Sequence, residues 1–343
     1  MLDSIQTITL LGLPGFGKAK VNSIMKEATF QPSNLAELLE LIIELNGKVP
    51  RLKIPNNAQL EKSYDIAKRT IEQSEKLGIK ILTPLNSSFP LRLKHIPDPP
   101  AILYVKGNVE CLNSELSVAV IGTREPSAYG EKCGQLFARK FTEKGLVIVS
   151  GLAKGIDTAG HQGCLSAKGQ TIAVLAQGLD TGIYPSENRP LADKIIDEGG
   201  CLVSEYTLGV RGRPNFFVER DRLQAGLSSG VTVIETDIKG GTMHTAGYCL
   251  EQKKPLGCLN HPEKFLKNND KARGNQKLIN EGKAMSLFSP EETDSYISKM
   301  EKLSDFKKRL EKLAIQSKPK KSEQKNKQDN KGEEDSFEQM KFF

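Results

Sequence analysis

The stretch LVIVSGLAKGIDTAGHQGCLSA, residues 146–167, carries the pattern that decides the fold. It begins with Leu146–Ser150, a continuous apolar run of the kind that forms a strand buried on both faces. It ends with Ile156–Ala167, which has the apolar spacing of a helix. A short glycine-bearing loop joins the two. The stretch therefore predicts a buried strand, a tight turn and a helix.

The same alternation continues on both sides of this stretch. Further strands are predicted at Ala101–Val105, Val118–Ile121, Thr171–Leu175, Cys201–Ser204, Val231–Glu235 and Leu256–Leu259. Further helices are predicted at Ala128–Glu143, Leu191–Glu198 and Thr242–Gln252. Strands that alternate with helices form βαβ units with right-handed crossovers. The chain is thus expected to form an α/β domain with a doubly wound, mostly parallel sheet.

Three regions of the chain differ in character. Residues 1–75 look helical, with an apolar band over Leu38–Leu45 and a helix over Tyr64–Leu77, and residues 76–290 hold the α/β pattern. Residues 291–343 are charged, and we expect them to pass from helical to disordered because almost nothing apolar follows Ser317 until the last few residues.

Composition narrows the function classes. The net charge of +7 permits a nucleic-acid partner without demanding one. The six cysteines form no C-x-x-C pair and there are four histidines, so we expect no metal site and no disulfide framework. No cofactor is predicted either. The first residues do not look like a signal peptide, and no apolar run approaches the roughly 18 residues that span a bilayer. We expect a cytoplasmic protein.

Four segments near predicted strand ends are rich in glycine, hydroxyl and basic residues, and ligands of open α/β sheets bind at strand ends. The candidate DNA- or phosphate-binding residues are Gly122, Thr123, Arg124, Ser150, Gly151, Lys154, Gly155, Arg220, Arg222, Gly240, Gly241 and Thr242. Backbone amides at helix starts and arginine forks suit phosphate oxygens. We find no nucleophile paired with a base, so no catalytic residue is predicted.

Each segment also has a structural interpretation. Gly122–Arg124 and Gly240–Thr242 resemble ordinary turns, and Asp157 is expected to cap the helix that follows it. Arg220 and Arg222 could pair with neighbouring acids instead of phosphates. The rings of Phe216 and Phe217 could stack on bases, although a buried position is expected for at least one of them.

A glycine loop near the N-terminus, within ITLLGLPGFGKAK (residues 8–20), allows three interpretations. Gly12 to Lys18 follows the first part of a P-loop, but Ala19 stands where a hydroxyl should reach Mg²⁺. The loop could also be the turn of a helix-hairpin-helix whose Gly15, Gly17 and Lys18 contact DNA phosphates, or a purely structural turn. We favour the hairpin.

Several long motifs resemble the DprA/Smf (DNA-processing protein A) family. They are VAVIGTREPSAYG (118–130), IVSGLAKGIDTAGHQGCLSA (148–167), TIAVLAQGLDTGIYPSEN (171–188), LVSEY (202–206), residues 217–228 and IPDPPAILYVKG (96–107). The resemblance covers about residues 80–285. It implies an extended Rossmann-like domain and a homodimer that binds single-stranded DNA and loads a RecA-type recombinase during transformation, with no catalytic reaction.

The resemblance has departures that leave other functions open. Asp221 stands in the middle of the family's R-N-R motif, where an acid weakens the positive potential, and Gly247 replaces an arginine. A nucleotide-sensing, antitoxin or defence protein is one alternative. A nucleotide-cleaving enzyme is another, because Gly240-Gly241-Thr242 resembles part of such a loop, but the acid that the loop needs is missing.

Overall fold

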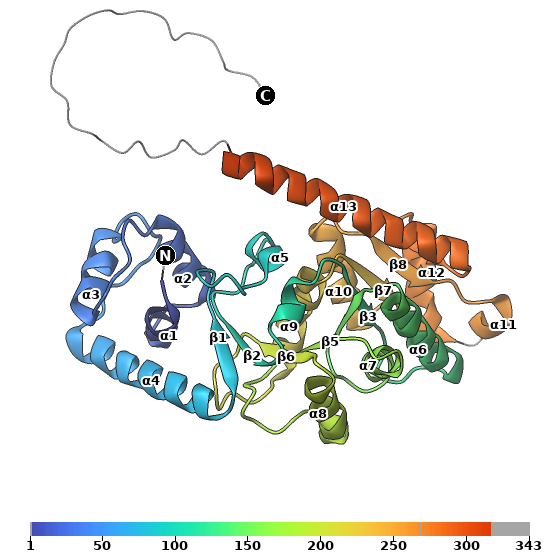
Figure 1. The fold of residues 1–343 in the computed structure, drawn as a ribbon, viewed down its shortest axis with the longest axis horizontal. Coiled ribbons are helices and arrows are strands. Elements are labelled where there is room, and N and C mark those ends of the chain that lie inside the picture. The colour runs from blue at the N-terminus through green and yellow to red at the C-terminus, as the bar shows by residue number, and fades with distance from the viewer. Residues whose placement is uncertain (1, 268, 317–343) are drawn as a thin grey trace, which may run out of the picture. The chain divides into compact units, whose positions relative to one another are not determined.

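The computed structural model describes residues 2–267 and 269–316, and for residues 305–316 it describes the helix but not the side chains. Residues up to Asp305 form one compact unit, to which the following description applies. Its centre is a sheet whose strands run between two layers of helices (Figure 1). The predicted α/β class is confirmed.

The sheet has the order β1-β2-β6-β5-β4-β3-β7-β8-β9. Its strands are β1 (Ile79–Leu82), β2 (Leu103–Gly107), β3 (Ser117–Ile121), β4 (Val147–Ser150), β5 (Thr171–Val174), β6 (Cys201–Ser204), β7 (Gly230–Val233), β8 (Leu256–Leu259) and β9 (Met285–Leu287). The pairs β1/β2 and β2/β6 are antiparallel, and the other neighbours are parallel. The mostly parallel, doubly wound sheet follows the prediction.

Helices and single turns connect these strands. They are α5 (Leu91–Lys94), η1 (Glu110–Asn113), α6 (Ala128–Glu143), α7 (Ile156–Ser166), η2 (Ser186–Asn188), α8 (Arg189–Asp197), α9 (Pro214–Leu227), α10 (Thr242–Glu251), α11 (Glu263–Leu266), η3 (Asp270–Ala272), α12 (Arg273–Asn280) and α13 (Pro290–Gln316).

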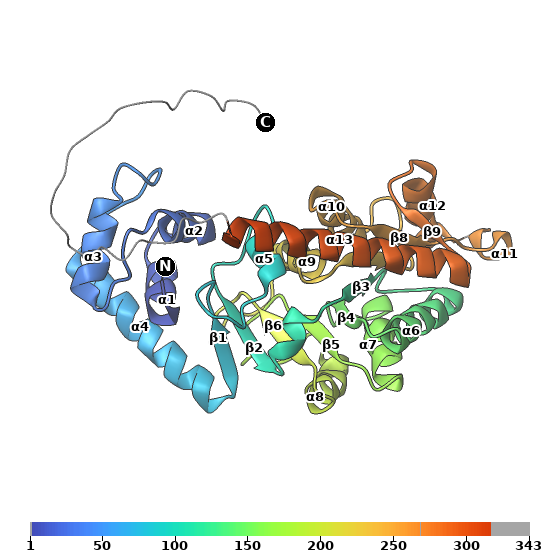
Figure 2. The same cartoon turned by 45° about the horizontal axis from the view of Figure 1, so that its top comes forward.

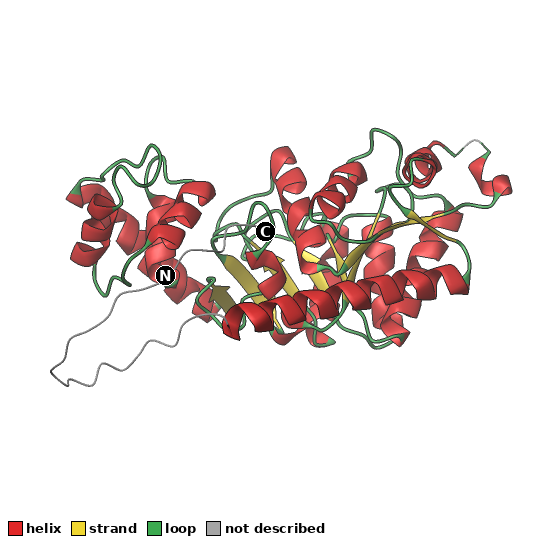
Figure 3. Ribbon diagram, turned by 90° about the horizontal axis from the view of Figure 1, so that it is seen from above, coloured by secondary structure: helices red, strands yellow, loops and turns green. Residues whose placement is uncertain are grey.

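The two faces of each central strand bury different helices. On β3, Val118 and Val120 pack in one apolar cluster with α6 and α7, whereas Ala119 and Ile121 pack in another with α9, α10 and α12. Figure 3 shows the strands lying between the helices. Burial on both faces explains why the strands read as continuous apolar runs.

Two edge strands were not predicted from the sequence. In β1, Lys80 is exposed between the buried Ile79 and the half-buried Ile81, and β9 has only three residues. A short or alternating segment carries too weak an apolar signal to be recognised alone. Helix α9 was also not predicted, because none of the helices expected from the sequence covers Pro214–Leu227.

The N-terminal region is helical, as predicted. It consists of α1 (Ser4–Gly12), α2 (Lys18–Glu27), α3 (Leu35–Glu44) and α4 (Asn57–Lys76), grouped beside β1 and β2 (Figure 2). Leu10, Val21 and Leu41 are fully buried within this group. Ile8 and Ala67 belong instead to a cluster that includes sheet residues, so the region packs on the sheet.

The core of the α/β domain extends past residue 290. Tyr296, Ile297 and Met300 of α13 are buried in the same cluster as α6. Part of the segment assigned to the tail from its charge is therefore domain core, and residues 317–343 lie outside the described part of the chain. Within the described residues, no helix is long and apolar enough to cross a membrane.

Candidate functional site

A crevice of about 570 Å³ opens at the carboxyl ends of β3 and β7 and beside the loop that follows β4. The chain leaves β3 toward β4 on one side of the sheet and later returns to place β7 on the other side. Ligands of open α/β sheets bind at such a change of direction. Residues from all four segments that we singled out in the sequence line its wall.

The segment after β3 contributes one exposed cation. Gly122 is needed for packing, because a Cβ there would lie 2.6 Å from the Ile156 side chain. The Thr123 amide, which we expected to face a phosphate, donates to the Glu235 carbonyl at 2.8 Å instead. Arg124 is exposed, and among the described residues it forms no ion pair. Arg124 is therefore the member of this motif that is available to a ligand.

Small residues in the segment after β4 contact other groups of the protein and are not free to bind a ligand. The buried Ser150 hydroxyl donates to the Val120 carbonyl at 2.7 Å. The Gly151 amide donates to Asp157, which does not cap α7 as predicted, because the cap residue is Gly155. Lys154 is exposed but lies 2.5 Å from Glu187. Only Lys154 of this segment can present a charge to a ligand.

Arg220 is buried beneath the crevice. Its guanidinium lies against Gly151, where a Cβ would come within 1.5 Å of Nη1, and it donates to the Val174 carbonyl at 3.0 Å. Its Nε lies 3.4 Å from Asp221. The predicted phosphate contact does not fit this position, and Arg220 forms part of the crevice floor.

Arg222 points away from the crevice into a network of acids. It donates to both oxygens of Glu205, at 2.8 and 2.6 Å, and to Asp98 at 2.8 Å. The side chain is 4% exposed. The alternative interpretation from the sequence, pairing with carboxylates, is the observed one.

The segment after β7 keeps free backbone donors. Gly240 and Gly241 precede α10, whose first residue is Thr242. The amides of Gly241 and Thr242 donate to no backbone carbonyl among the described residues. All three residues line the crevice, as the phosphate-site prediction requires.

Aromatic rings border the crevice next to Arg124. The Arg124 guanidinium lies 5.3 Å from the centre of the Phe217 ring, and Tyr184 lies 5.7 Å from the same ring. Phe216 stacks on Tyr206 with the ring centres 4.3 Å apart. Both phenylalanines are half-buried, so the expectation of one buried ring was wrong. Tyr184 was not among the site residues predicted from the sequence, although its position in the loop after β5 places it on the side of the sheet where ligands bind.

The floor of the crevice holds two acids beside Arg220. Burial raises the pKa of Asp157 despite the opposing charge of Arg220. Burial also raises the pKa of Asp221 to about 6, with Asp157 adding to the rise and Arg220 opposing it. The floor is thus mixed in charge, and the rim carries Arg124 and Lys271 together with Glu125 and Asp237.

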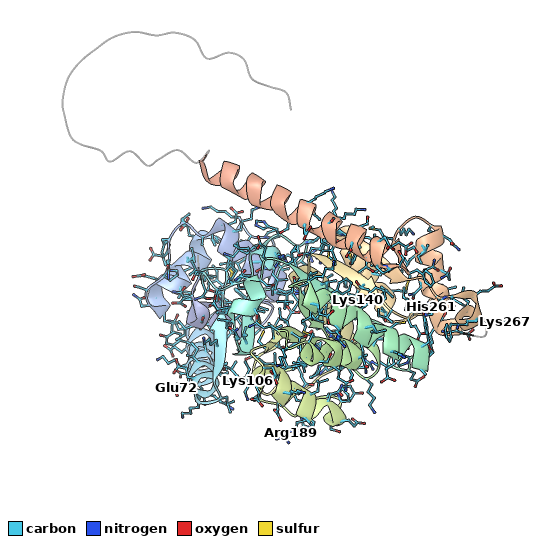
Figure 4. All side chains as sticks on the ribbon, turned by 45° about the vertical axis from the view of Figure 1, so that its right-hand side comes forward. Glu72, Lys106, Lys140, Arg189, His261 and Lys267 are labelled. Atoms are coloured by element: carbon cyan, nitrogen blue, oxygen red, sulfur yellow. The ribbon has the colours of Figure 1, made fainter. Side chains whose placement is uncertain are left out.

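Glu235, at the end of β7, anchors the crevice wall and holds no ligand. It accepts hydrogen bonds from the Ser127 amide, the Ser127 hydroxyl and Asn269, and lies 3.2 Å from His261. Although burial opposes it, these bonds hold the pKa of Glu235 below its ordinary value. Figure 4 shows His261 at the end of the domain near Lys267, far from Lys106 and Glu72. Among the described residues, no cluster of three or more acidic, histidine or cysteine side chains could hold a metal.

The N-terminal glycine loop joins two helices. Because α1 rather than a strand precedes it, the loop is not a P-loop. Gly15 has φ = 81°, and Gly17 is the N-cap residue of α2. Lys18 pairs with Asp98 at 2.6 Å and so connects this region to the Arg222 network. The arrangement agrees with a helical hairpin, and its contact with DNA stays a prediction.

The sequence of the α/β domain is similar to a known protein family. The family model for DNA recombination-mediator protein A matches residues 80–298. Protein Smf of Escherichia coli (strain K12) is 39% identical over 212 residues, which are 62% of this chain and 55% of that protein. DNA processing protein DprA of Bacillus subtilis (strain 168) is 35% identical over 238 residues, 68% of this chain and 76% of that protein.

Two solved structures are similar. DNA processing protein A from Streptococcus pneumoniae has a TM-score of 0.70 at 29% identity, covering 86% of this chain and 98% of that one. DNA processing protein A from Helicobacter pylori, in a study of its single-stranded DNA binding mode, has a TM-score of 0.56 at 30% identity, covering 64% and 94%.

Proposed function

The chain belongs to the DNA recombination-mediator protein A family, and from that premise we propose that its crevice binds single-stranded DNA in support of recombination. The Helicobacter pylori relative is described as having a single-stranded DNA binding mode, which supports the choice of ligand. In this chain, residues of the crevice would contact the strand.

One observation carries the proposal, namely the cluster of Arg124, Phe217 and Tyr184 at the crevice mouth. Single-strand binding combines cations that follow the backbone with aromatic faces on which bases stack. Arg124 presents a guanidinium to a phosphate while it lies over the Phe217 ring at 5.3 Å. The half-buried Phe217 and the exposed Tyr184 offer ring surface to bases.

The crevice favours a single strand over a duplex. Its volume of about 570 Å³ has room for one splayed-out nucleotide, whereas paired bases in a duplex keep their faces stacked on one another. Two further cations lie near Arg124: the exposed Lys154 after β4 and the half-buried Lys271 on the lining, which is 3.9 Å from Glu125. The free amides of Gly241 and Thr242 add donors for phosphate oxygens.

We extend the proposal to the partners that the DprA/Smf resemblance implies. The protein would pass the bound strand to a RecA-type recombinase and act as a homodimer. It would do so without catalysing a reaction, since the crevice pairs no nucleophile with a base. Binding of a free nucleotide, as in a sensor, is the competing function because the crevice is of nucleotide size.

The experiment is a titration of the full chain with a labelled strand of about 40 nucleotides at about 50 mM and about 200 mM salt. The same strand annealed to its complement is the control, and free nucleoside monophosphates are added as competitors. We expect binding to the single strand that weakens with salt and exceeds binding to the duplex. No binding at the lower salt refutes the proposal, and full displacement by free nucleotides at similar concentration favours the sensor.

A further inference from the structure

Asp221 is an acid on the floor of a crevice that carries Arg124 at its rim. It lies on α9 between the buried Arg220 and Arg222, and its side chain is 14% exposed. One oxygen, Oδ1, accepts from the amide of Gln224 at 2.9 Å and lies 3.4 Å from Nε of Arg220. The Thr245 side chain is a third hydrogen-bonding neighbour. A carboxylate has about four acceptor positions, so these neighbours leave acceptor capacity toward the crevice.

The neighbours of Asp221 on the crevice floor are mostly turned toward the protein. Gln224 is 2% exposed and donates to Asp221. The guanidinium of Arg220 is directed to Val174 and Gly151 beneath. The second acid of the floor, Asp157, is buried, whereas Asp221 is partly exposed. Asp221 is therefore the acid of the floor that can accept a hydrogen bond from a ligand.

This distribution of charge fixes how a nucleotide can lie in the crevice. A carboxylate repels a phosphate, so the phosphates belong at the rim with Arg124. The base is then the part that reaches the floor. An ionised acidic side chain accepts hydrogen bonds from an exocyclic amino group, such as N4 of cytosine. It cannot hydrogen-bond a carbonyl oxygen, because both groups are acceptors.

We propose that Asp221 selects the base that enters the crevice, favouring one with an exocyclic amino group over thymine. The inference rests on the proposed binding of single-stranded DNA and adds a base preference to it. Cytosine and thymine test it well because both are pyrimidines of similar size. At the position where cytosine carries the N4 amino group, thymine carries the O4 oxygen.

The preference for cytosine over thymine should depend on pH. The ionised carboxylate only accepts hydrogen bonds and repels a carbonyl oxygen, whereas the protonated carboxyl can donate to that oxygen. Burial raises the pKa of Asp221 to about 6, so it is ionised at neutral pH and neutral in mild acid. The groups that face it are Arg220 on its own helix, Asp157 on α7, and His244 with Thr245 on α10. Any pH effect that persists in Asp221→Asn belongs to one of these groups instead.

The experiment compares two strands of equal length, one of thymines only and one in which isolated cytosines replace some thymines. Isolated cytosines avoid the paired structures that runs of cytosine form in acid. Dissociation constants are measured at about pH 7.5 and about pH 5.5, on either side of the Asp221 pKa. The parent should bind the cytosine-bearing strand at least about tenfold more tightly at the higher pH, as expected for one hydrogen bond to a charged group.

Two variants of matched charge isolate the cause. Asp221→Asn and Asp237→Asn each remove one negative charge from the crevice lining. Asp237 lies on the β7–α10 loop and accepts from the Ile238 amide. Asp237→Asn should bind both strands more tightly and keep the ratio of the two affinities. Asp221→Asn should bind the thymine strand more tightly, bring the ratio to about one and remove the pH dependence of that ratio.

The outcomes separate this inference from the proposed function. If the parent binds both strands equally and Arg124→Ala weakens both, the strand-binding proposal stands and the base preference is refuted. If Asp237→Asn brings the ratio of the two affinities to about one as Asp221→Asn does, the overall charge of the crevice explains the preference and the inference is refuted. If neither strand binds, both proposals fail together. Melting curves of both variants confirm that they are folded.

Discussion

Arg222 and Glu205 form a bidentate ion pair beneath the surface, with Nη1 to Oε1 at 2.8 Å and Nη2 to Oε2 at 2.6 Å. Asp98 accepts a third bond from Arg222, and Lys18 of the N-terminal region pairs with the same Asp98. The network ties α9, the loop after β6, the segment before β2 and α2 together. A residue that looked like a DNA ligand in the sequence is thus a structural connection.

We expect Arg222→Ala to destabilise the fold by about 3 kcal/mol, because its removal leaves the largely buried Glu205 with only Lys18, 3.8 Å away, as a counter-charge. The measurement is thermal or denaturant unfolding. Lys154→Ala is the control, since its exposed pair with Glu187 should contribute little. A folded Arg222→Ala of normal stability with lost DNA binding would contradict the structural role.

We expect Gly151→Ala to cost about 1–3 kcal/mol in unfolding free energy, because the new methyl group would overlap the Arg220 guanidinium. Gly241→Ala is the control in the same crevice. It has φ = −56° and open space at its Cβ, so it should change stability by only a few tenths of a kcal/mol. Equal melting temperatures for both variants would show that Gly151 does not make room for Arg220.

The roles of Arg222 and Gly151 show which features of the structure the sequence could predict and which it could not. Continuous apolar runs and helical spacing were sufficient to predict the sheet, and the rule on strand ends was sufficient to locate the crevice. The sequence did not distinguish small residues that serve packing from those that face a ligand. Gly122, Ser150 and Gly151 have the composition of a phosphate loop but contact neighbouring protein groups.

The long-range contacts explain the other differences. Glu205, Asp98 and Arg222 lie far apart along the chain, so their network has no local signal. Tyr184 and Phe217 meet only because the loop after β5 reaches α9. Periodicity and motifs report on neighbours in sequence, whereas these contacts depend on the finished fold.

Phe217→Ala should weaken binding of single-stranded DNA by about 5- to 150-fold, the range for loss of one stacking platform. Phe288→Ala is the control, because Phe288 is 62% exposed and does not line the crevice. Fluorescence anisotropy with a labelled strand measures both. Similar losses in the two variants would mean that the strand does not stack on Phe217.

The purified protein should not hydrolyse ATP or nucleoside monophosphates. The Gly12–Lys18 loop follows a helix and has Ala19 where a P-loop needs a hydroxyl, and Glu235 is held by Ser127, Asn269 and His261. Chromatography of each nucleotide after incubation measures this. Turnover that Asp221→Asn abolishes would replace the binding proposal with an enzyme in which Asp221 is the base.

The central claim is that the strand's phosphates bind at the crevice mouth beside Arg124. The most direct measurement is the salt dependence of single-strand affinity for Arg124→Ala beside Arg139→Ala, which removes an equally exposed charge from α6, where Arg139 pairs with Glu143. The account predicts that Arg124→Ala weakens binding and lowers the slope of log affinity against log salt by about one unit, while Arg139→Ala leaves both unchanged. Identical affinities and slopes for the parent and both folded variants would contradict it.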